Sequence, residues 1–355
     1  METEVEDSTS VQVCDATMLS KEQMPVTKKE NNPKLMRAAV LARPKTFEIA
    51  TVEAPQLAAA QVKVRVQGCG ICASRMPLWE GREWFDYPVA SGAPGHEGWG
   101  VVEAVGEQIS SVRAGDRVAF LGGRSYAEFD IADEGAVVKL PAAFADAPFP
   151  GEPLGCAMNI FERSNISKDD TVAIVGIGFL GALLCQLAKH AGAKVIAISR
   201  RQFSLDFATK YGADEVITLG ETWEVKNKVS EITGGSFCSR VIEATGKQQA
   251  IDVSTEIVSE GGRLIIAGYH QDGLRQVNMQ TWNWKGIDVI NAHERKPERY
   301  LHGMRMAVDA VEKGIINPSE LYTDVFSLEE IGKGFEMTAG RPDGFMKALV
   351  EINAK

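Results

Sequence analysis

The segment that most constrains the fold runs from Val172 to Gly181 and reads VAIVGIGFLG. An apolar run typical of a buried strand leads into a glycine turn, and Gly176, Gly178 and Gly181 have G-x-G-x-x-G spacing. In such a turn the first glycine permits the tight bend and the second lets a pyrophosphate approach the backbone. The third lets the following helix pack close to the strand. The free N–H groups and positive dipole end of that helix favour an anion.

The residues after the turn complete a β-α-β unit. Apolar residues recur at helical spacing from Leu180 to Ala191, Gly192 ends the pattern, and a second apolar strand follows over residues 194–199. This context favours a dinucleotide site over a glycine-rich turn without a ligand. The residues predicted to contact the cofactor here are Gly176, Gly178, Phe179, Leu180 and Gly181.

The end of the second strand indicates which dinucleotide binds. An NAD site carries an acidic residue about 20 residues after the glycines, where it binds the ribose 2′-hydroxyl. This chain instead has Ser199, Arg200 and Arg201. These residues present no carboxylate to repel a 2′-phosphate, and guanidinium and hydroxyl groups bind one well. We therefore expect NADP(H) in preference to NAD(H), and the alternative interpretation is a solvated basic turn.

The composition restricts the class of protein. A chain of 355 residues is long enough for two domains, and 45% hydrophobic and 24% charged residues are typical of a soluble globular protein. No apolar run reaches the ~18 residues of a membrane span, so we expect no membrane partner. A net charge of −10 argues against a nucleic-acid surface. The six cysteines are irregularly spaced, which favours a reducing, cytoplasmic location over a disulfide framework.

The hydrophobic pattern changes along the chain. The first 34 residues are polar and acidic without periodicity, which indicates a disordered extension. Short alternating runs separated by glycine and proline then predict a β-rich unit up to about residue 150. From about residue 167 to residue 292, strands alternate with helices, which predicts a parallel sheet covered on both faces. A helix over residues 299–313 and a strand over residues 345–352 are predicted to return to the first unit.

Three further segments carry side chains that suit a metal. They read GCGIC at 68–72, GHEG at 95–98 and EPLGC at 152–156. Zinc takes thiolate, imidazole and carboxylate ligands, and a catalytic zinc keeps three protein ligands and one open position. The pattern therefore makes Cys72, His96, Glu97, Glu152 and Cys156 candidate zinc ligands.

These motifs resemble those of the medium-chain dehydrogenase/reductase superfamily, specifically its zinc-dependent alcohol and polyol dehydrogenases. The resemblance extends from Met36 to Ile352 and rests on GIC at 70–72, GHE at 95–97, GDRV at 115–118, EPL at 152–154 and the glycine turn. It implies an α/β fold, with a Rossmann doubly wound parallel sheet, a GroES-like β-barrel catalytic domain, and an active-site cleft between them.

The resemblance also implies domain boundaries. We expect the disordered extension over residues 1–34, the GroES-like catalytic domain over 35–156, the Rossmann domain over 157–296, and a return to the catalytic domain over 297–355.

Carried over by position, the family pattern assigns a role to several residues. Cys72 and His96 resemble the first two zinc ligands, Glu152 the glutamate of polyol-type members, and Glu97 an alternative inner carboxylate. Cys156 lies one helical turn beyond Glu152, so it is either a further ligand or a small buried helix residue. Ser74 resembles the hydroxyl that passes the substrate proton towards solvent, with an ordinary turn serine as the alternative. Lys347 is a candidate partner of Glu97, although a basic residue beside an edge strand needs no such partner.

Two departures from the family pattern matter. The four-cysteine lobe that holds a structural zinc in many members is missing, so we expect one catalytic zinc per chain and no structural zinc. Position 75 is arginine, where many members have an aspartate that orients the ligating histidine. An arginine cannot accept the histidine proton. Either another group accepts it, or the zinc is weakly bound.

The function expected from these observations is reversible hydride transfer between NADP(H) and an alcohol, aldehyde or ketone, with Cys72, His96 and Ser74 as catalytic residues. One alternative is a zinc-free NADPH-dependent enone or quinone reductase, and another is a non-catalytic NADPH-binding protein. His293 is interpreted as structural more readily than as catalytic. Family members are commonly homodimers or homotetramers, and we expect the same here.

Overall fold

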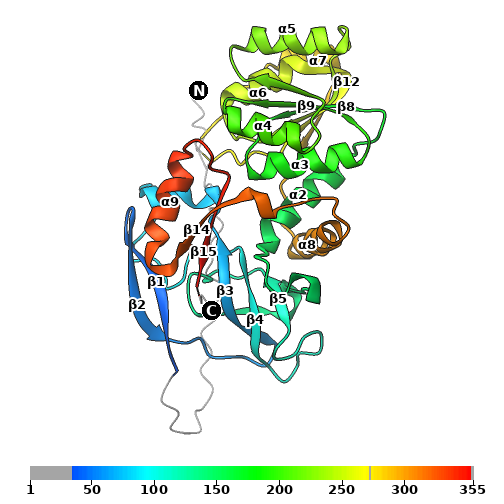
Figure 1. Ribbon diagram of the computed structural model, residues 1–355. Helices are drawn as coiled ribbons and strands as arrows, with labels where there is room; N and C mark the ends of the chain where they lie inside the picture. The colour runs from blue at the N-terminus through cyan, green and yellow to red at the C-terminus, as the bar shows by residue number, and fades with distance from the viewer. Residues whose placement is uncertain (1–33, 272, 353–355) are drawn as a thin grey trace, which may run out of the picture. The chain divides into compact units, whose positions relative to one another are not determined.

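The computed structural model describes residues 34–271 and 273–352. The extension expected over residues 1–34 therefore lies outside the described residues, except for Lys34. The described chain contains two main sheets, shown in Figure 1. Of the helices in the described part, none is both long and apolar enough to cross a membrane.

The second half of the chain forms a six-stranded parallel sheet. Its strands are β8 (Thr171–Val175), β9 (Lys194–Ser199), β10 (Glu215–Thr218), β11 (Cys238–Glu243), β12 (Val258–Ile266) and β13 (Asp288–Asn291). They lie in the order β10-β9-β8-β11-β12-β13, and every neighbouring pair is parallel. Numbered along the chain this is the order 3-2-1-4-5-6 of a dinucleotide-binding sheet, whose direction of winding reverses beside the first strand. The predicted parallel sheet is confirmed.

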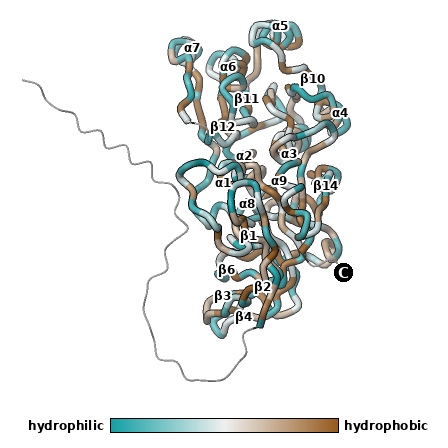
Figure 2. Tube along the Cα trace, turned by 90° about the vertical axis from the view of Figure 1, so that its left-hand side faces the viewer, coloured by the Kyte–Doolittle hydropathy of each residue, from teal (hydrophilic) through white to brown (hydrophobic). Residues whose placement is uncertain are grey.

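Helices cover both faces of this sheet (Figure 1). They are α3 (Phe179–His190), α4 (Gln202–Lys210), α5 (Thr222–Thr233), α6 (Gln248–Ile257) and α7 (Met279–Lys285). Successive residues of β8 point to opposite faces of the sheet and pack into separate hydrophobic cores. Ile174 belongs to the core that includes α3 and α4, and Val175 belongs to the core that includes α5 and α6. Hydrophilic and hydrophobic residues alternate along α5 (Figure 2), whose buried residues Val225 and Val229 lie about one turn apart.

The other large sheet has seven strands. It is built from β3 (Gln61–Gly70), β4 (Gly98–Val105), β5 (Arg117–Phe120), β6 (Phe129–Asp133), β7 (Val137–Lys139), β14 (Tyr322–Ser327) and β15 (Lys347–Glu351). The order is β14-β15-β3-β4-β5-β7, with β6 paired to β3 as well. The last strand of the described chain thus lies between β14 and β3. A separate hairpin joins β1 (Leu35–Arg43) to β2 (Thr46–Glu53).

The remaining helices connect the two sheet regions or flank them. They are α1 (Met76–Glu80), α2 (Gly151–Ser164), α8 (Pro297–Glu312) and α9 (Ile331–Gly340). The helix predicted over residues 299–313 is confirmed as α8, and the predicted strand over 345–352 is confirmed in shorter form as β15. The domain boundary expected after residue 156 falls inside α2, so a single helix leads from one region into the next.

Candidate functional site

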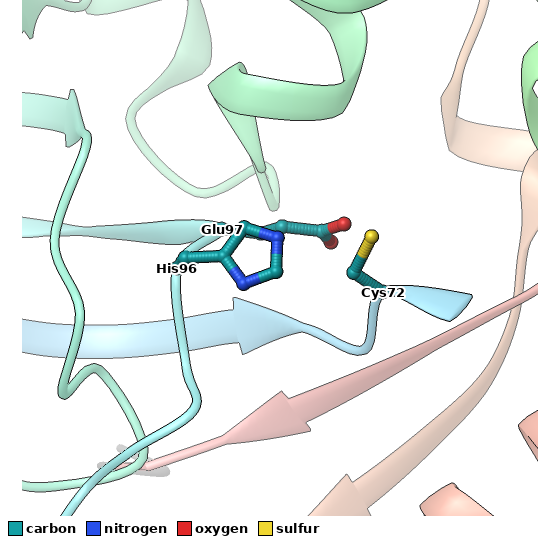
Figure 3. Close-up of side chains that lie close together, drawn as sticks. All are labelled: Cys72, His96 and Glu97. Carbon is teal, nitrogen blue, oxygen red and sulfur yellow. The ribbon is translucent and has the colours of Figure 1, made fainter. Parts of the chain in front are cut away.

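Cys72, His96 and Glu97 converge at the end of two neighbouring strands. Cys72 follows β3, whereas His96 and Glu97 directly precede β4, which pairs with β3. One ligand atom of each residue lies within 4.8 Å of those of the other two. Figure 3 shows the three side chains pointing toward one another. A Cβ on Gly70 would overlap the Glu97 carboxylate, which explains the glycine in the GIC motif.

The imidazole of His96 presents different surroundings to its two nitrogens. Nδ1 lies 3.1 Å from the carbonyl oxygen of Pro94 and accepts a 3.1 Å hydrogen bond from Nε of Arg75. The other ring nitrogen, Nε2, points toward Glu97 and Cys72 in Figure 3. Nε2 is therefore the nitrogen that faces the cluster. The carbonyl of Pro94 can take the proton of Nδ1 only in the tautomer that carries a proton there, in which the Arg75 hydrogen bond is lost.

Glu97 is fully buried in an ion pair with Lys347 of β15. The ammonium donates to Oε1 at 2.8 Å and lies 2.6 Å from Oε2, yet Oε2 has no hydrogen-bond partner among the described residues. Burial lowers the pKa of Lys347, but the Glu97 carboxylate beside it outweighs burial and holds that pKa above its usual value. A buried carboxylate oxygen without a hydrogen bond is well suited to an electrophilic ligand.

Glu152 and Cys156 approach the cluster from the first turns of α2. The Cys156 thiol donates a 3.3 Å hydrogen bond to Oε1 of Glu152, so the two side chains share one face of the helix. Burial raises the pKa of Glu152, and the charge of His96 opposes that rise. Burial also raises the pKa of Cys156 well above its usual value, and the Glu152 carboxylate adds to the effect. Cys156 therefore contacts the site residue Glu152 and is not only a helix-core thiol.

Ser74 lies beside the first candidate ligand. Its hydroxyl donates a 3.1 Å hydrogen bond to Sγ of Cys72. Burial, followed by the negative charge of Glu97, raises the pKa of Cys72 to about 11. A metal cation removes this penalty because it stabilises the thiolate directly. The thiol, the imidazole nitrogen and the Oε2 of Glu97, which accepts no hydrogen bond from a described residue, form a mixed S, N and O donor set, and this set fits zinc.

The glycine turn has the geometry expected of a pyrophosphate site. Gly176 has φ +107°, which side chains other than that of glycine rarely adopt, and a Cβ on Gly181 would overlap the carbonyl oxygen of Gly176. A Cβ on Gly178 would meet nothing within 4 Å. Among the described residues, no side chain caps the N-terminus of α3. The strand, turn and helix predicted here are confirmed.

Phe179, the first residue of α3, connects this turn to the cluster. Its ring stacks on Tyr322 of β14 at 6.0 Å between centroids, and the ammonium of Lys347 lies 5.2 Å from its centroid. Lys347 in turn holds Glu97. The two candidate sites, one for a dinucleotide and one for a metal, are therefore joined by direct side-chain contacts. Leu180 follows Phe179 in the first turn of α3.

The three residues predicted to select the cofactor have different environments. Ser199 is buried at the end of β9 and its Oγ accepts from the backbone N–H of Arg201 at 3.3 Å. Arg200 is exposed. The guanidinium of Arg201 donates to the carbonyl oxygen of Phe345, and burial, followed by the charge of nearby Arg341, lowers the pKa of Arg201. Within the part of the chain that the structure describes, no such contact holds Arg200 to the returning segment.

Sequence reasoning missed a charged cluster at the end of β11. Glu243 is fully buried, and its Oε1 accepts from the backbone N–H groups of Thr245 and Gly246 at 2.7 and 2.9 Å. Its Oε2 lies 2.9 Å from Nε2 of His270, and Nε of Arg275 donates to Nδ1 of the same ring at 3.0 Å. A buried glutamate at the end of a parallel strand is the signal that sequence analysis passed over.

The segment that carries His270 also reaches the residues beside the cluster of Cys72, His96 and Glu97. The side-chain amide of Gln271 donates a 3.3 Å hydrogen bond to the backbone carbonyl of Ala73, between Cys72 and Ser74. His293, half-buried near the same strand ends, contacts the carbonyl oxygen of Gly268 at 3.1 Å through Nε2, and burial lowers its pKa.

Residues 58–142 match the family model described as the alcohol dehydrogenase GroES-like domain, and residues 180–309 match the one described as zinc-binding dehydrogenase. The seven-stranded and the parallel sheets therefore correspond to the two parts of the fold class that we expected.

Similar proteins include a sorbitol dehydrogenase of Halalkalibacterium halodurans, which is 27% identical over 84% of this chain and 95% of the relative. A solved zinc-binding dehydrogenase of Sinorhizobium meliloti 1021, bound to NADP, has a TM-score of 0.78 and 23% identity over 90% of this chain and 100% of the other. A short chain alcohol dehydrogenase of Escherichia coli CFT073, complexed with NADH, has a TM-score of 0.77 and is 23% identical. The match covers 90% of this chain and 99% of the other. At these identities the two structures establish the fold.

Proposed function

This chain belongs to the medium-chain dehydrogenase/reductase superfamily, in its zinc-dependent alcohol and polyol dehydrogenase type, and on that premise we propose that it transfers a hydride between NADP(H) and an alcohol or carbonyl substrate. The observation that carries the proposal is the convergence of Cys72, His96 and Glu97 next to the glycine turn. The similarity to a sorbitol dehydrogenase favours a polyol or another secondary alcohol as substrate.

The residues of the cluster have separable roles. Cys72 and His96 are the proposed metal ligands, with Glu152 as the third ligand and Glu97 as the alternative carboxylate. Glu152 is favoured because Glu97 is already neutralised by Lys347, whereas the one hydrogen bond found for Glu152 among the described residues comes from Cys156. Cys156 remains a possible further ligand. Zinc, when bound, supplies a Lewis acid that polarises the substrate oxygen.

The proton of the alcohol needs a path away from the buried cluster. We assign this role to Ser74, whose hydroxyl is adjacent to Cys72 and is free to rotate from the thiol toward a substrate oxygen. The nicotinamide supplies the hydride chemistry, and the chain positions it through the glycine turn and Phe179. We propose NADP(H) as the preferred cofactor because Arg200 is exposed at the end of β9 and no acidic residue occupies that turn.

The assembly and location follow from related features. Among the described strands, β13 pairs only with β12. Val289 on this strand is 37% exposed, and Trp284, which precedes it in α7, is 85% exposed. We propose that this edge pairs with a second copy of the chain in a homodimer or homotetramer. The five cysteines of the described chain are all free, which supports a reducing, cytoplasmic compartment.

Metal content and activity test the proposed function together. The purified full chain is expected to hold about one zinc per chain and to oxidise members of a polyol and secondary-alcohol panel with NADP⁺. Cys72→Ser is expected to lose the zinc and to lower kcat/KM by more than about 100-fold, with NADPH binding retained. Cys185→Ala, which removes a buried core cysteine of α3, serves as the matched control and is expected to retain zinc.

Full activity after complete removal of metal would instead support the zinc-free enone or quinone reductase. One observation favours that second candidate, namely the hydrogen bond from Arg75 to a candidate zinc ligand. NADPH binding without turnover on any alcohol, aldehyde or ketone would support the non-catalytic alternative.

A further inference from the structure

The contact between Arg75 and His96 has a chemical consequence for the imidazole. Arg75 ends the short 3₁₀ helix Ala73–Arg75, which begins directly after Cys72, and its Nε lies 3.1 Å from Nδ1 of His96. A guanidinium carries only donors and stays protonated in proteins. The hydrogen bond therefore requires a lone pair on Nδ1. In the neutral ring the proton must then be on Nε2.

The carbonyl oxygen of Pro94 requires the opposite arrangement. It also lies 3.1 Å from Nδ1, and because a carbonyl oxygen only accepts, that contact is a hydrogen bond when Nδ1 carries the proton. One ring nitrogen cannot hold a proton and a free lone pair at once. Arg75 and Pro94 therefore stabilise different tautomers of the same histidine.

Only one of these tautomers can bind a metal at the cluster. Nε2 is the nitrogen that points toward Cys72 and Glu97 (Figure 3), so a ligand bond there needs a lone pair on Nε2 and the proton on Nδ1. That is the arrangement in which Pro94 accepts. Within the described residues no carboxylate contacts Nδ1, so nothing else opposes Arg75 at this position.

We propose that Arg75 is a positioning residue that competes with the metal for His96: it holds the imidazole in the tautomer that cannot ligate, so zinc binding has to break this hydrogen bond. The inference rests on the proposed function in taking His96 as a zinc ligand. This competition weakens zinc binding for two reasons. The metal-bound chain loses the hydrogen bond from Arg75 to His96, and the positively charged guanidinium of Arg75 then lies near the zinc. Zinc on this chain is consequently an exchangeable ligand.

The tautomer of His96 is measured first, without metal. In the metal-free full chain with ¹⁵N-labelled histidine, the ring ¹⁵N shifts are expected to show His96 protonated on Nε2, and His96→Asn identifies the signal. Arg75→Met, which removes the donor and keeps the length of the side chain, is expected to move the proton to Nδ1. A wild-type His96 already protonated on Nδ1 would overturn the proposal.

Zinc affinity is measured second, by competition with a chromophoric chelator. Arg75→Met and Arg75→Asp are expected to bind zinc about 10- to 100-fold more tightly than the wild type, the range seen for groups that orient a ligating histidine. Arg113→Met makes the same change at a side chain that is 86% exposed and is expected to leave the affinity unchanged. Unchanged or weaker binding in both Arg75 variants, with NADPH binding retained, would contradict the proposal.

The two measurements separate this inference from the proposed function. A chain that binds no zinc in any variant contradicts the proposed function and the competition together, whereas a chain with tight zinc and no response to Arg75→Met contradicts only the competition. The tautomer readout concerns Arg75 alone, because it uses neither metal nor activity.

Discussion

Gly176, Gly178 and Gly181 lack a side chain for three different reasons. The first adopts a positive φ, and the third lies so close to the carbonyl oxygen of the first that a Cβ would overlap it. The second has ordinary backbone angles, φ −94° and ψ −163°, and open space around it. Two of these glycines are therefore needed by the fold itself, whereas the middle one is needed only if an anion occupies the space beside it.

This difference leads to a paired prediction. Gly178→Ala is expected to leave the urea midpoint of unfolding unchanged and to weaken NADPH binding at least about 10-fold, because the added methyl occupies the space of the pyrophosphate. Gly181→Ala is expected to lower the unfolding midpoint, because strand and helix must move apart. Fluorescence titration with NADPH and urea denaturation check both variants. Equal NADPH affinity of Gly178→Ala and the wild type would argue against the proposed pyrophosphate position.

The choice between NADPH and NADH is proposed to depend on the single side chain of Arg200. Arg200→Ala is expected to raise the KM for NADPH at least about 10-fold and to leave the KM for NADH unchanged, because only NADPH carries the 2′-phosphate that a guanidinium would bind. Steady-state kinetics with both cofactors measure the ratio. Lys45→Ala, far away in sequence on the β1–β2 turn, is the control for loss of one positive charge. A parallel loss with both cofactors would place Arg200 outside the cofactor site.

The segment that follows β12 is held in place by a row of charged side chains that includes His270 and Arg275. Glu243 fixes His270, Arg275 fixes the other side of the same ring, and Arg275 also donates to the carbonyl oxygen of Gly246 at 3.0 Å. Gln271 then attaches the segment to Ala73, beside the proposed zinc ligand. The segment thus connects the strand ends of the parallel sheet to the proposed metal site.

Loosening this connection has a testable effect. His270→Leu is expected to speed backbone hydrogen exchange over residues 268–271 and to raise the KM for NADPH several-fold, because the ring that joins Glu243 to Arg275 is lost. Hydrogen-exchange mass spectrometry and steady-state kinetics measure the two effects. His302→Leu, on the surface of α8 with a side chain 46% exposed, is the control. Unchanged exchange in His270→Leu would mean that the segment is held by other contacts.

Sequence patterns predicted those helices and strands that are determined by residues adjacent in the chain. The β-α-β unit at the glycine turn was predictable because its strand, turn and helix signals are adjacent in the chain. Strand β3 continues through Gly68 to Gly70, which the alternating pattern does not predict because glycine usually marks a turn. Here Gly68 is required because a Cβ would overlap the ring of Trp99 on the paired strand. That contact is visible only when the pairing is known.

The sequence predicted which residues form the candidate site better than it predicted which of their atoms are in contact. The family resemblance pointed to Cys72, His96 and Glu97 and to the pairing of Glu97 with Lys347, which the structure confirms as a contact. It gave no information on which atoms Arg75 or Cys156 would touch. Those contacts depend on side-chain directions at the ends of separate elements, and periodicity does not encode such directions.

The Glu97–Lys347 ion pair joins residues 250 positions apart in the chain and so ties its first and last described parts together. Lys347→Met would leave Glu97 buried without its cation, and breaking a buried pair in this way costs about 3–5 kcal/mol. Lys333→Met removes a lysine that is 67% exposed and paired with Glu330, for which about 0–1 kcal/mol is expected. Urea denaturation of both variants measures the difference. Similar small losses would show that the buried pair adds little to stability.

The place of β15 between β14 and β3 has a consequence for how the protein is made. Domains generally fold during synthesis as their residues leave the ribosome, beginning with the N-terminal one. Here the unit that is synthesised first cannot close its sheet until residues 347–351 have emerged, so the later-synthesised nucleotide-binding half is free to mature before it. Until residues 347–351 have been synthesised, residues 68–70 of β3 lack their partner strand, and this end of the sheet stays open on the nascent chain.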